Sequence, residues 1–579
     1  MDSQLPKSQI IAISAIQGIA LTLLYLSHDH QMWPATSPMW LTALVTLALS
    51  LPLLLLLCIT KTNDKAVLTY LAPFTVLLSV LGGYVGFQQE PVEFVRNYNV
   101  IPIFTFTALI ASFKALMYIQ QRVSQQPISY GALFELSWRN FILFGESCLF
   151  VLFFWGILHL GASLFAVIEI DFFKTLLNKE WFTIPVLSLA FGFATIVFRN
   201  ITNTLATIAA IFHTLFKFLL PALTIVSLGF LVTLPFTGLG TLWKTGSGSF
   251  LVLWLQALSL FFVNAVYQGN NDERPYHVII HRLIFIGVAL LPIYSVIAAY
   301  GLWLRIDQYG LTVDRCWAVM VWLLLACFAV GYLWGIIRKR DAWVETQSQV
   351  NIGMGLAVLV LLLLVNSPLL NFQSLSASSQ LARLEKGFVT PEQFDFAYFE
   401  RSLGRQGYLA IQQLEQEWQT SAPEKVAILD RLYTQRSHFA RETAASSSGK
   451  EAKKTLVNFK KQMVFWPNKG AFPESLLEKV YFVETEHNWQ SSKSNTYYFI
   501  ARDLNDDGKP DFVVIKENSG WTSAKLWQLQ QGEWKASYMK TTNPSNLHYL
   551  KSLLDSNDVT TVKPKWDKLK VGDLTFEVQ

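Results

Sequence analysis

Oxygen-bearing side chains recur at alternate positions in the nine residues DLNDDGKPD, near the end of this 579-residue chain. Asp503, Asn505 and Asp507 occupy the first, third and fifth positions of the stretch. Asp511 occupies the ninth, and the carbonyl of Lys509 is a further oxygen ligand. Ca²⁺ takes six to eight oxygens at about 2.3–2.6 Å, and a glycine at the sixth position permits a sharp turn. The spacing therefore predicts a calcium-binding loop.

The surroundings of this loop differ from those of an EF-hand. An EF-hand has a glutamate at position twelve and helices on both sides, whereas this loop has Val514 there and strand-like flanks. It resembles instead the calcium loops between strands in FG-GAP and VCBS-type β repeats, where an aspartate at the ninth position completes the site. The alternative is an acidic hairpin turn whose carboxylates face water. Three carboxylates without a cation would repel one another, which favours calcium.

Three further polar side chains lie inside apolar segments, where charge is costly. Lys114 lies about two turns before Arg122, and Glu146 lies about two turns after Arg139. Consecutive antiparallel helices would bring Lys114 and Glu146 to a similar depth. That pair would serve an ion or proton path or a substrate contact, or would only pack two helices together. His159 is solitary on an apolar stretch, where a hydrogen-bonded packing role is the simpler interpretation.

The elements that carry these groups follow from the hydropathy. Hydrophobic residues make up 52% of the chain and charged residues 15%, against about a quarter charged in soluble domains. Before about residue 370 the apolar residues form runs of roughly 17–25, the length that crosses a bilayer core. About eleven spans are predicted, with cores at 10–27, 38–59, 66–87, 100–119, 140–168, 182–198, 215–236, 249–268, 281–303, 316–337 and 350–370, and the stretch 200–214 is expected in the interface.

The fold class predicted is a polytopic α-helical membrane protein with a C-terminal α+β extramembrane domain. We expect a transmembrane bundle over 1–370, a helical periplasmic segment over 371–450 and a β-rich domain over 451–579. Helical spacing of apolar residues recurs at 396–418 and 424–443. Short aromatic or β-branched runs predict strands at 479–485, 496–504, 511–517, 524–530 and 533–540.

The bias of Lys and Arg among the short loops predicts the orientation. With the N-terminus in the cytoplasm, the inner loops hold more basic residues than the outer ones, and RKR at 338–340 is the strongest single signal. Eleven spans then place the C-terminal domain outside. In a bacterium with two membranes this is the periplasm, where calcium is plentiful, and a periplasmic protein or the cell wall is an expected partner beside the lipid bilayer.

Several function classes receive no support from the residues. The chain has no basic stripe interleaved with aromatic residues, so nucleic-acid binding is not expected. Its four cysteines form no C-x-x-C pair, and neither G-x-S-x-G nor H-E-x-x-H occurs. No catalytic constellation is therefore recognised.

Four stretches carry a resemblance to a known family: LRIDQYGLTVDR at 304–315, SQLARLEKG at 379–387, FDFAYFERSLGRQG at 394–407 and ERPYHVIIHR at 273–282. They resemble signature stretches of the bacterial multi-pass membrane family known as domain of unknown function 4153, over roughly residues 140–410. The resemblance implies an inner-membrane protein of unassigned activity, with no catalytic residues to transfer.

Two functions remain open at this point. One is transport of a small solute, or a role associated with transport. The number of spans favours this function, and the small number of polar groups inside the spans opposes it. The other is an envelope structural or sensing protein whose helices anchor a periplasmic binding domain. In both, the predicted Ca²⁺ has a structural role.

Overall fold

In the computed structural model the chain forms two compact units, Met1–Arg441 and Glu442–Gln579. The structure describes residues 6–92, 95, 99–200, 202–238, 240, 248–268, 275–391, 393–421, 426, 463–468, 470, 472–486, 496–504, 510–518, 521–530, 533–539, 554, 569–571 and 574–576.

Eleven helical segments among the described residues are long and apolar enough to cross a membrane, as the hydropathy predicted. They are α1 (Lys7–Asp29), α2 (Pro38–Cys58), α3 (Asp64–Phe87), α4 (Val100–Val123), α5 (Tyr130–Val167), α7 (Glu180–Arg199), α8 (Thr202–Thr237), α10 (Gly248–Tyr267), α11 (Val278–Ala289) together with α12 (Leu291–Tyr309), α13 (Val313–Lys339) and α14 (Trp343–Val365). The shorter elements are α6 (Phe172–Leu177), η1 (Arg340–Ala342) and η2 (Pro368–Leu370).

Two spans differ from the expected ones. The stretch 202–214 is the beginning of α8, a single helix of 36 residues, and not a separate interfacial segment. The ninth span is broken in two, because α11 ends at Ala289 and α12 begins at Leu291, directly before Pro292. Proline has no backbone N–H and disfavours a helical residue before it, which accounts for the break.

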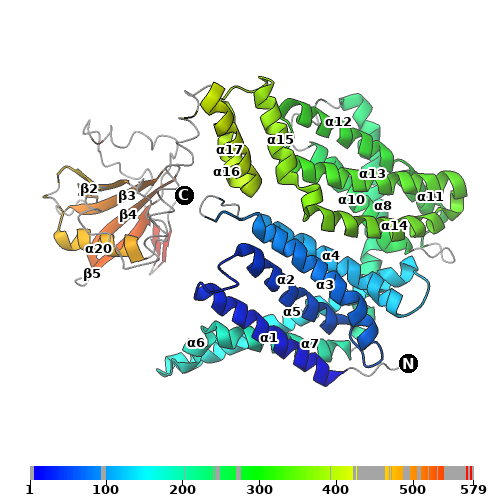
Figure 1. Cartoon of the computed structure of the whole chain (residues 1–579), viewed down its shortest axis with the longest axis horizontal. Helices are drawn as coiled ribbons and strands as arrows, with labels where there is room; N and C mark the ends of the chain where they lie inside the picture. The colour runs from blue at the N-terminus through cyan, green and yellow to red at the C-terminus, as the bar shows by residue number, and fades with distance from the viewer. Residues whose placement is uncertain are drawn as a thin grey trace. The chain divides into compact units, whose positions relative to one another are not determined.

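The spans form two sub-bundles (Figure 1). The first sub-bundle consists of α1–α7 and the second of α8 and α10–α14, and each has its own buried core. They meet where α4 and α5 lie against α14 and where α5 lies against α8, and this contact is called the seam. The split gives six spans on one side and five on the other.

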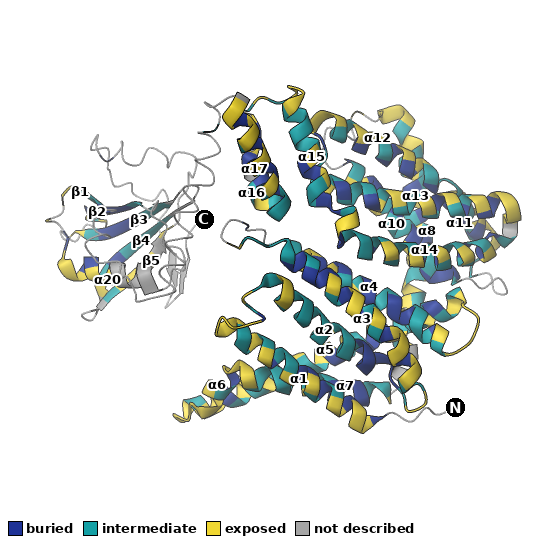
Figure 2. Cartoon of the chain, viewed as in Figure 1, coloured by how far each residue is buried: buried dark blue, intermediate teal, exposed yellow. Residues whose placement is uncertain are grey.

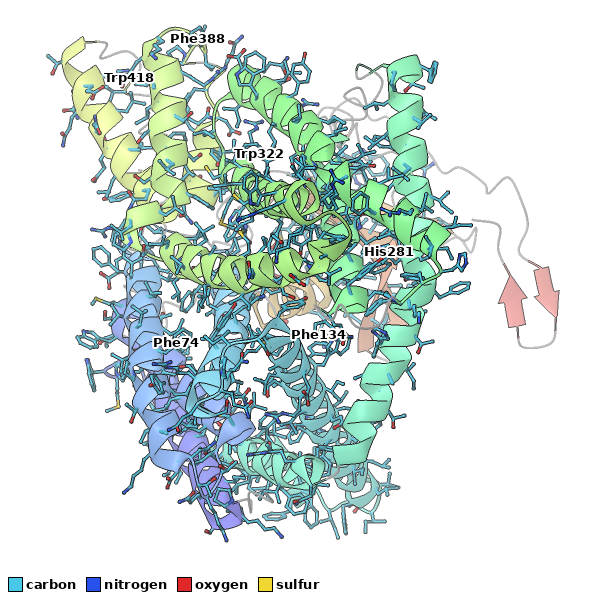
Figure 3. All side chains as sticks on the ribbon, turned by 90° about the vertical axis from the view of Figure 1, so that its right-hand side faces the viewer. Phe74, Phe134, His281, Trp322, Phe388 and Trp418 are labelled. Atoms are coloured by element: carbon cyan, nitrogen blue, oxygen red, sulfur yellow. The ribbon has the colours of Figure 1, made fainter. Side chains whose placement is uncertain are left out.

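Exposed residues lie along many of the spans (Figure 2), and a large share of them are large and apolar. Ile16 on α1, Leu152 on α5 and Val296 on α12 are each more than 60% exposed. The interior also contains polar residues (Figure 3), such as Trp322, whose indole N–H donates to the Ser295 carbonyl at 2.8 Å. Apolar residues outside and hydrogen-bonded polar groups inside are what a bundle in lipid requires.

Three further helices form a small head on the first unit: α15 (Phe372–Glu385), α16 (Phe396–Ser402) and α17 (Gly404–Ser421). The head has its own core, which includes Phe399, Leu403 and Ile411. The helix predicted over 396–418 is present but is interrupted at Leu403, between α16 and α17. Apart from residue 426, the helix predicted over 424–443 lies outside the described residues.

The second unit contains a five-stranded sheet in the order β1-β2-β3-β4-β5. Its strands are β1 (Met463–Trp466), β2 (Thr496–Arg502), β3 (Asp511–Asn518), β4 (Trp521–Gln530) and β5 (Glu533–Met539), with a separate pair β6 (Leu569–Val571) and β7 (Leu574–Phe576). β1 and β2 are parallel and the other neighbours in the large sheet are antiparallel. Four of the five predicted strands are confirmed, at β2 to β5.

The fifth predicted strand, over 479–485, is wrong because these residues belong to the helix α20 (Glu474–Glu486). Leu476, Leu477 and Val480 lie on one helical face, and all three are buried in the core of the sheet. Pro473 and the acidic Glu474 are typical of a helix start, and this signal outweighs the strand-like composition that follows.

The packing of α2 against α3 leads to a testable prediction. A Cβ atom at Gly86 would overlap the carbonyl oxygen of Pro38, whereas one at Gly83 would lie 3.4 Å from the Cβ of Ala43, an ordinary contact. We expect Gly86→Ala to lower the free energy of unfolding by about 1–3 kcal/mol through overpacking. Gly83→Ala is the matched control and should be close to neutral. Thermal unfolding in detergent checks both, and equal effects would contradict the packing described.

Candidate functional site

The predicted calcium loop joins two antiparallel strands, with Arg502 of β2 paired to Asp511 of β3. Asp511 accepts a hydrogen bond from the backbone N–H of Leu504 through Oδ2 at 3.1 Å, which closes the turn. Among the described residues no group of three His, Cys, Asp or Glu side chains could hold a metal ion. Asn505, Asp507 and Lys509 lie outside the described residues, so the calcium site stays a prediction.

The three polar residues predicted inside the membrane are not joined by hydrogen bonds. Lys114 on α4 and Glu146 on α5 are half-buried on neighbouring helices, but the described part of the chain shows no ion pair between them. His159 is exposed, and its ring meets the ring of Trp155 edge-on, with centroids 4.4 Å apart. A functional role for these three residues stays a prediction.

The seam is bridged by hydrogen bonds between uncharged groups. Each joins an element of the first sub-bundle to α10, α14 or the residues that follow α14. They are Tyr130 OH to the Asn264 carbonyl at 3.4 Å, Tyr118 OH to the Ile352 carbonyl at 2.8 Å, Asn366 Nδ2 to Thr107 Oγ1 at 2.9 Å, and Asn371 Nδ2 to Tyr84 OH at 2.7 Å. Because α4 and α14 are antiparallel, the Thr107 and Tyr118 contacts lie near opposite ends of the seam.

At the Tyr118 end, four residues of the second sub-bundle form what we call the amide cluster. Asn264 of α10 accepts three hydrogen bonds through Oδ1: from the hydroxyl of Tyr332 on α13 at 2.7 Å, and from the amides of Gln347 and Asn351 on α14 at 2.7 and 2.8 Å. The side chains of Tyr332 and Gln347 are buried, with exposures of 1% and 0%. Oδ1 of Asn264 thus joins the helices α10, α13 and α14 by hydrogen bonds.

The amide cluster has more hydrogen-bonding capacity than its own members use. The hydroxyl of Tyr332 lies against Oδ1 of Asn351 as well as Oδ1 of Asn264, but it has a single proton to donate. Gln347 faces Asn264 with one polar atom of its amide, and the other has no partner among the described residues. Buried polar atoms are nearly always paired, so Oε1 of Gln347 is an acceptor that a water molecule or another small donor would satisfy.

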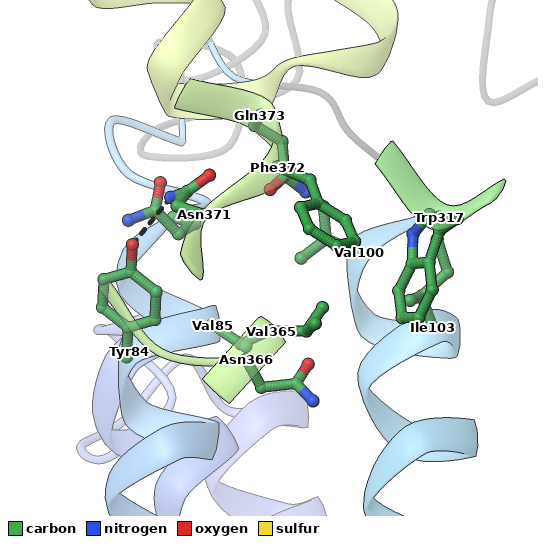
Figure 4. Close-up of a pocket in the computed structure, with 11 residues that line it drawn as sticks. Tyr84, Val85, Val100, Ile103, Trp317, Val365, Asn366, Asn371, Phe372 and Gln373 are labelled. Atoms are coloured by element: carbon green, nitrogen blue, oxygen red, sulfur yellow. Dashed lines mark hydrogen bonds between the residues drawn. The ribbon is translucent and has the colours of Figure 1, made fainter. Parts of the chain in front are cut away.

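A cavity of about 40 Å³ lies at the other end of the seam (Figure 4). It is lined from both sub-bundles and from the head, with the Asn371–Tyr84 hydrogen bond at one side and Asn366 below. A water molecule needs roughly 10–15 Å³ of such space, so the cavity holds one to a few waters and no larger solute. In this conformation the seam is closed at this end.

The head is attached to the second sub-bundle at the turn between α12 and α13. Arg383 of α15 donates to the carbonyls of Asp307 and Gln308 at 2.9 and 2.6 Å, and so caps the end of α12. Gln380 donates to the carbonyls of Tyr309 and Leu311 at 2.9 and 2.8 Å. Gly310 at the turn has φ 72°, a conformation that favours glycine.

The hydroxyl of Tyr398 on α16 completes this attachment. It accepts from the backbone N–H of Val313 at 2.9 Å and pairs with the hydroxyl of Ser376. Burial raises the pKa of Tyr398, so the hydroxyl stays protonated at neutral pH. Three of the four stretches that carry the family resemblance, at 304–315, 379–387 and 394–407, thus meet in one structure.

Arg405 of α17 attaches the head to the first sub-bundle. Its guanidinium lies 4.2 Å from the ring centroid of Phe87, at the end of α3, and donates to the carbonyl of Glu90 at 2.8 Å. Its backbone N–H donates to the carbonyl of Gln88 at 3.3 Å. The head therefore contacts both sub-bundles at the same end of the bundle, and it spans the seam there.

The comparisons with known proteins agree with the resemblance read from the sequence. The family described as Domain of unknown function (DUF4153) matches residues 6–414. The chain belongs to this family. The DUF4153 match begins far before residue 140, so it includes the whole first sub-bundle, and it ends within α17. No curated protein and no solved structure matches the chain.

The amide cluster of this DUF4153 protein was not anticipated from its sequence. The residues predicted inside the membrane were two charged residues and a histidine, whereas the cluster is built from uncharged amides and a tyrosine. The available signal was the occurrence of Asn264 and Asn351 within or beside apolar runs, because an amide without a partner is also costly in hydrocarbon.

Removing the shared acceptor of the cluster should destabilise the bundle. Asn264→Ala leaves the amides of Gln347 and Asn351 without their acceptor, while the hydroxyl of Tyr332 keeps Oδ1 of Asn351. We expect the free energy of unfolding to fall by about 1–3 kcal/mol. The matched control is Ser259→Ala on the same helix, whose hydroxyl bonds only to the carbonyl of Leu255 one turn away. Thermal unfolding in detergent compares them, and an equal small effect for both would show that the cluster adds no stability.

Proposed function

We propose that this protein carries a small, uncharged polar solute across its membrane along the seam between the two sub-bundles. The observation that carries the proposal is the incompletely paired amide cluster at one end of the seam. The hydrogen-bonding groups that bridge the seam are uncharged, so their chemistry suits a neutral solute with hydrogen-bond donors and acceptors. Polar groups inside a membrane bundle commonly mark such a path.

The packing supports movement of one sub-bundle against the other. Each has its own core, so a small rotation would disturb the seam and the contacts of the head but leave the two cores intact. Between the Thr107 and Tyr118 contacts the seam includes apolar packing, with Ala108 and Leu363 beside a buried cluster. Transporters commonly expose a site to each side in turn by rocking two rigid bundles.

Cysteine accessibility tests this proposal without knowledge of the solute. In a variant with the four native cysteines changed to Ala, Asn351→Cys and Asn366→Cys report on the two ends of the seam. Both positions are buried here, with exposures of 7% and 8%. We expect both thiols to react with a membrane-impermeant maleimide, from opposite sides of the membrane, because the seam opens at each end in turn.

The control for this experiment is Thr75→Cys, at a fully buried position of α3 inside the first sub-bundle. It should stay unreactive while the seam positions react. If all three thiols stay unreactive in folded protein, the sub-bundles do not separate and the transport proposal fails.

The attachment of the head favours a second candidate, an envelope structural or sensing protein in which the helices anchor a binding domain. Arg383, Tyr398 and Arg405 fix the head to both sub-bundles. A partner that pulls on the C-terminal part would therefore act on the whole bundle. Unreactive seam thiols together with capture of a cell-wall or periplasmic component would support this candidate over transport.

The proposed location is the inner membrane of a bacterium, with the N-terminus in the cytoplasm and the C-terminal domain in the periplasm. Support comes from the Lys/Arg bias of the loops and from the odd number of spans. The head contacts the ends of α3 and α12, and in this topology both lie on the periplasmic side. A single-cysteine reporter after residue 540, labelled from outside in intact spheroplasts, checks the orientation.

We also propose that the loop from Asp503 to Asp511 binds one Ca²⁺ with a structural role. The antiparallel pairing of β2 and β3 supports the likeness to calcium loops between strands. Calcium at a hundred times its Kd should stabilise the unit that binds it by about 2.7 kcal/mol. We expect millimolar calcium to delay unfolding of this unit in the full-length protein but not in Asp503→Ala/Asp507→Ala. Equal unfolding of both proteins with and without calcium would contradict the site.

A further inference from the structure

The three-helix head contains a cavity of about 270 Å³, far larger than the cavity at the seam. Its walls are the end of α15, the turn that follows α15, and the last turns of α17. Figure 3 shows Phe388 of this turn and Trp418 of α17 near the top of the head. A water molecule needs only about 10–15 Å³, so this cavity admits a group much larger than water.

The turn that forms one wall is fixed by the way α15 ends. The N–H of Gly387 donates to the carbonyl of Leu384 at 3.1 Å, and the N–H of Phe388 donates to the carbonyl of Arg383 at 3.0 Å, which is the Schellman pattern. Gly387 has φ 71°, a left-handed conformation that favours glycine. The guanidinium of Arg383, which also caps α12, lies 5.7 Å from the ring centroid of Phe388. This wall therefore has a defined shape before any ligand binds.

The second wall comes from α17. Leu414, Glu417 and Trp418 are spaced three and four residues apart, so they lie on one face of the helix. Leu414 and Trp418 belong to the core of the head, with exposures of 4% and 9%. Together with Leu384 and Val389 of the first wall, they give the cavity an apolar surface.

Two carboxylates also line the cavity. Glu385 is the last residue of α15 and Glu417 is on α17, and both are exposed to solvent. Among the described residues that line the cavity there is no lysine or arginine. Oε1 of Glu417 accepts from the amide of Gln413 at 3.0 Å, and an amide orients a carboxylate without neutralising its charge. The cavity thus combines apolar walls with negative charge from both of them.

A lysine or arginine side chain has the complementary chemistry. Its apolar stem covers apolar surface while its charged end pairs with a carboxylate, and a cation is attracted to the ring of a tryptophan. The cavity is open to solvent on one side, whereas pockets for small molecules bury about 70–90% of the ligand surface. An open cavity of this kind suits a side chain that projects from a larger partner.

We propose that this cavity of the head receives a lysine or arginine side chain from a partner protein. The stem of that side chain lies against the apolar residues of both walls, and its charged end meets Glu385 and Glu417. The site is separate from the seam, and it does not depend on the transport proposal.

Saturation-transfer NMR of the full-length protein in a neutral detergent tests the site with the peptide acetyl-Gly-Lys-Gly-amide. We expect saturation of the lysine side-chain protons by the wild type. Glu385→Gln or Glu417→Gln should raise the Kd about two- to fivefold, the effect of one exposed ion pair. The matched control is Glu415→Gln on α17, whose carboxylate lies outside the cavity and accepts from the amide of Gln419 at 3.4 Å. It should leave the Kd unchanged.

Two further comparisons separate the cavity from its charge. A peptide with norleucine in place of lysine keeps the stem without the ammonium group, and should bind the wild type more weakly. Thr390→Phe fills the cavity and leaves both carboxylates in place, so it should abolish binding of the lysine peptide. Glu385, Glu417 and Thr390 are exposed, so their variants should unfold like the wild type.

The contrary outcomes also decide the matter. Equal binding of the lysine peptide by the wild type and Glu385→Gln/Glu417→Gln would overturn the site, and so would equal binding of the norleucine peptide. Unchanged binding by Thr390→Phe would show that surface charge alone holds the peptide, and would overturn the role of the cavity. Tighter binding of free n-butylammonium than of the lysine peptide would identify a site for small amines, and would overturn the assignment to a partner's side chain.

Discussion

A membrane interior offers no water to satisfy a polar group, and this constraint explains how the two halves of the bundle are held together. Tyr118, Thr107 and Tyr130 in the first sub-bundle each find their hydrogen-bond partner across the seam. Separating the halves would leave the hydroxyls of Tyr118 and Tyr130 unpaired unless another polar molecule replaced their partners, whereas Thr107 would keep its hydrogen bonds to the carbonyls of Ile103 and Phe104. The same constraint thus stabilises the closed seam and makes it suitable for a polar solute.

The arrangement of the head follows from the ends of the spans. A helix ends with carbonyls that lack partners inside it, and at the end of α12 these carbonyls accept from Arg383 of the head. Arg405 and Tyr398 add contacts to the chain at the ends of α3 and α12. Arginine suits this role because one planar group reaches two carbonyls at once.

Hydropathy was enough to predict the membrane spans, because each must be apolar over the length of a bilayer core. Short runs of aromatic and β-branched residues were enough to predict the strands β2 to β5. The stretches at 304–315 and 379–387 were singled out by resemblance, and the structure shows that Arg383 and Gln380 join them.

Other features depend on contacts that no local pattern records. α20 is a helix because Leu476, Leu477 and Val480 pack on the sheet, although its later residues are strand-like. The amide cluster brings Asn264 to residues more than 65 positions later in the chain. The pairing of the two sub-bundles cannot be inferred from the spacing of residues along one helix.

The attachment of Arg383 to the end of α12 also sets an order of events during synthesis. The carbonyls of Asp307 and Gln308 leave the ribosome 76 and 75 residues before the guanidinium that caps them. At about 5–20 residues per second, the end of α12 waits roughly 4–15 s for this cap. Through that interval α13 and α14 are made and inserted, so the turn at Gly310 is completed only after the last span has entered the membrane.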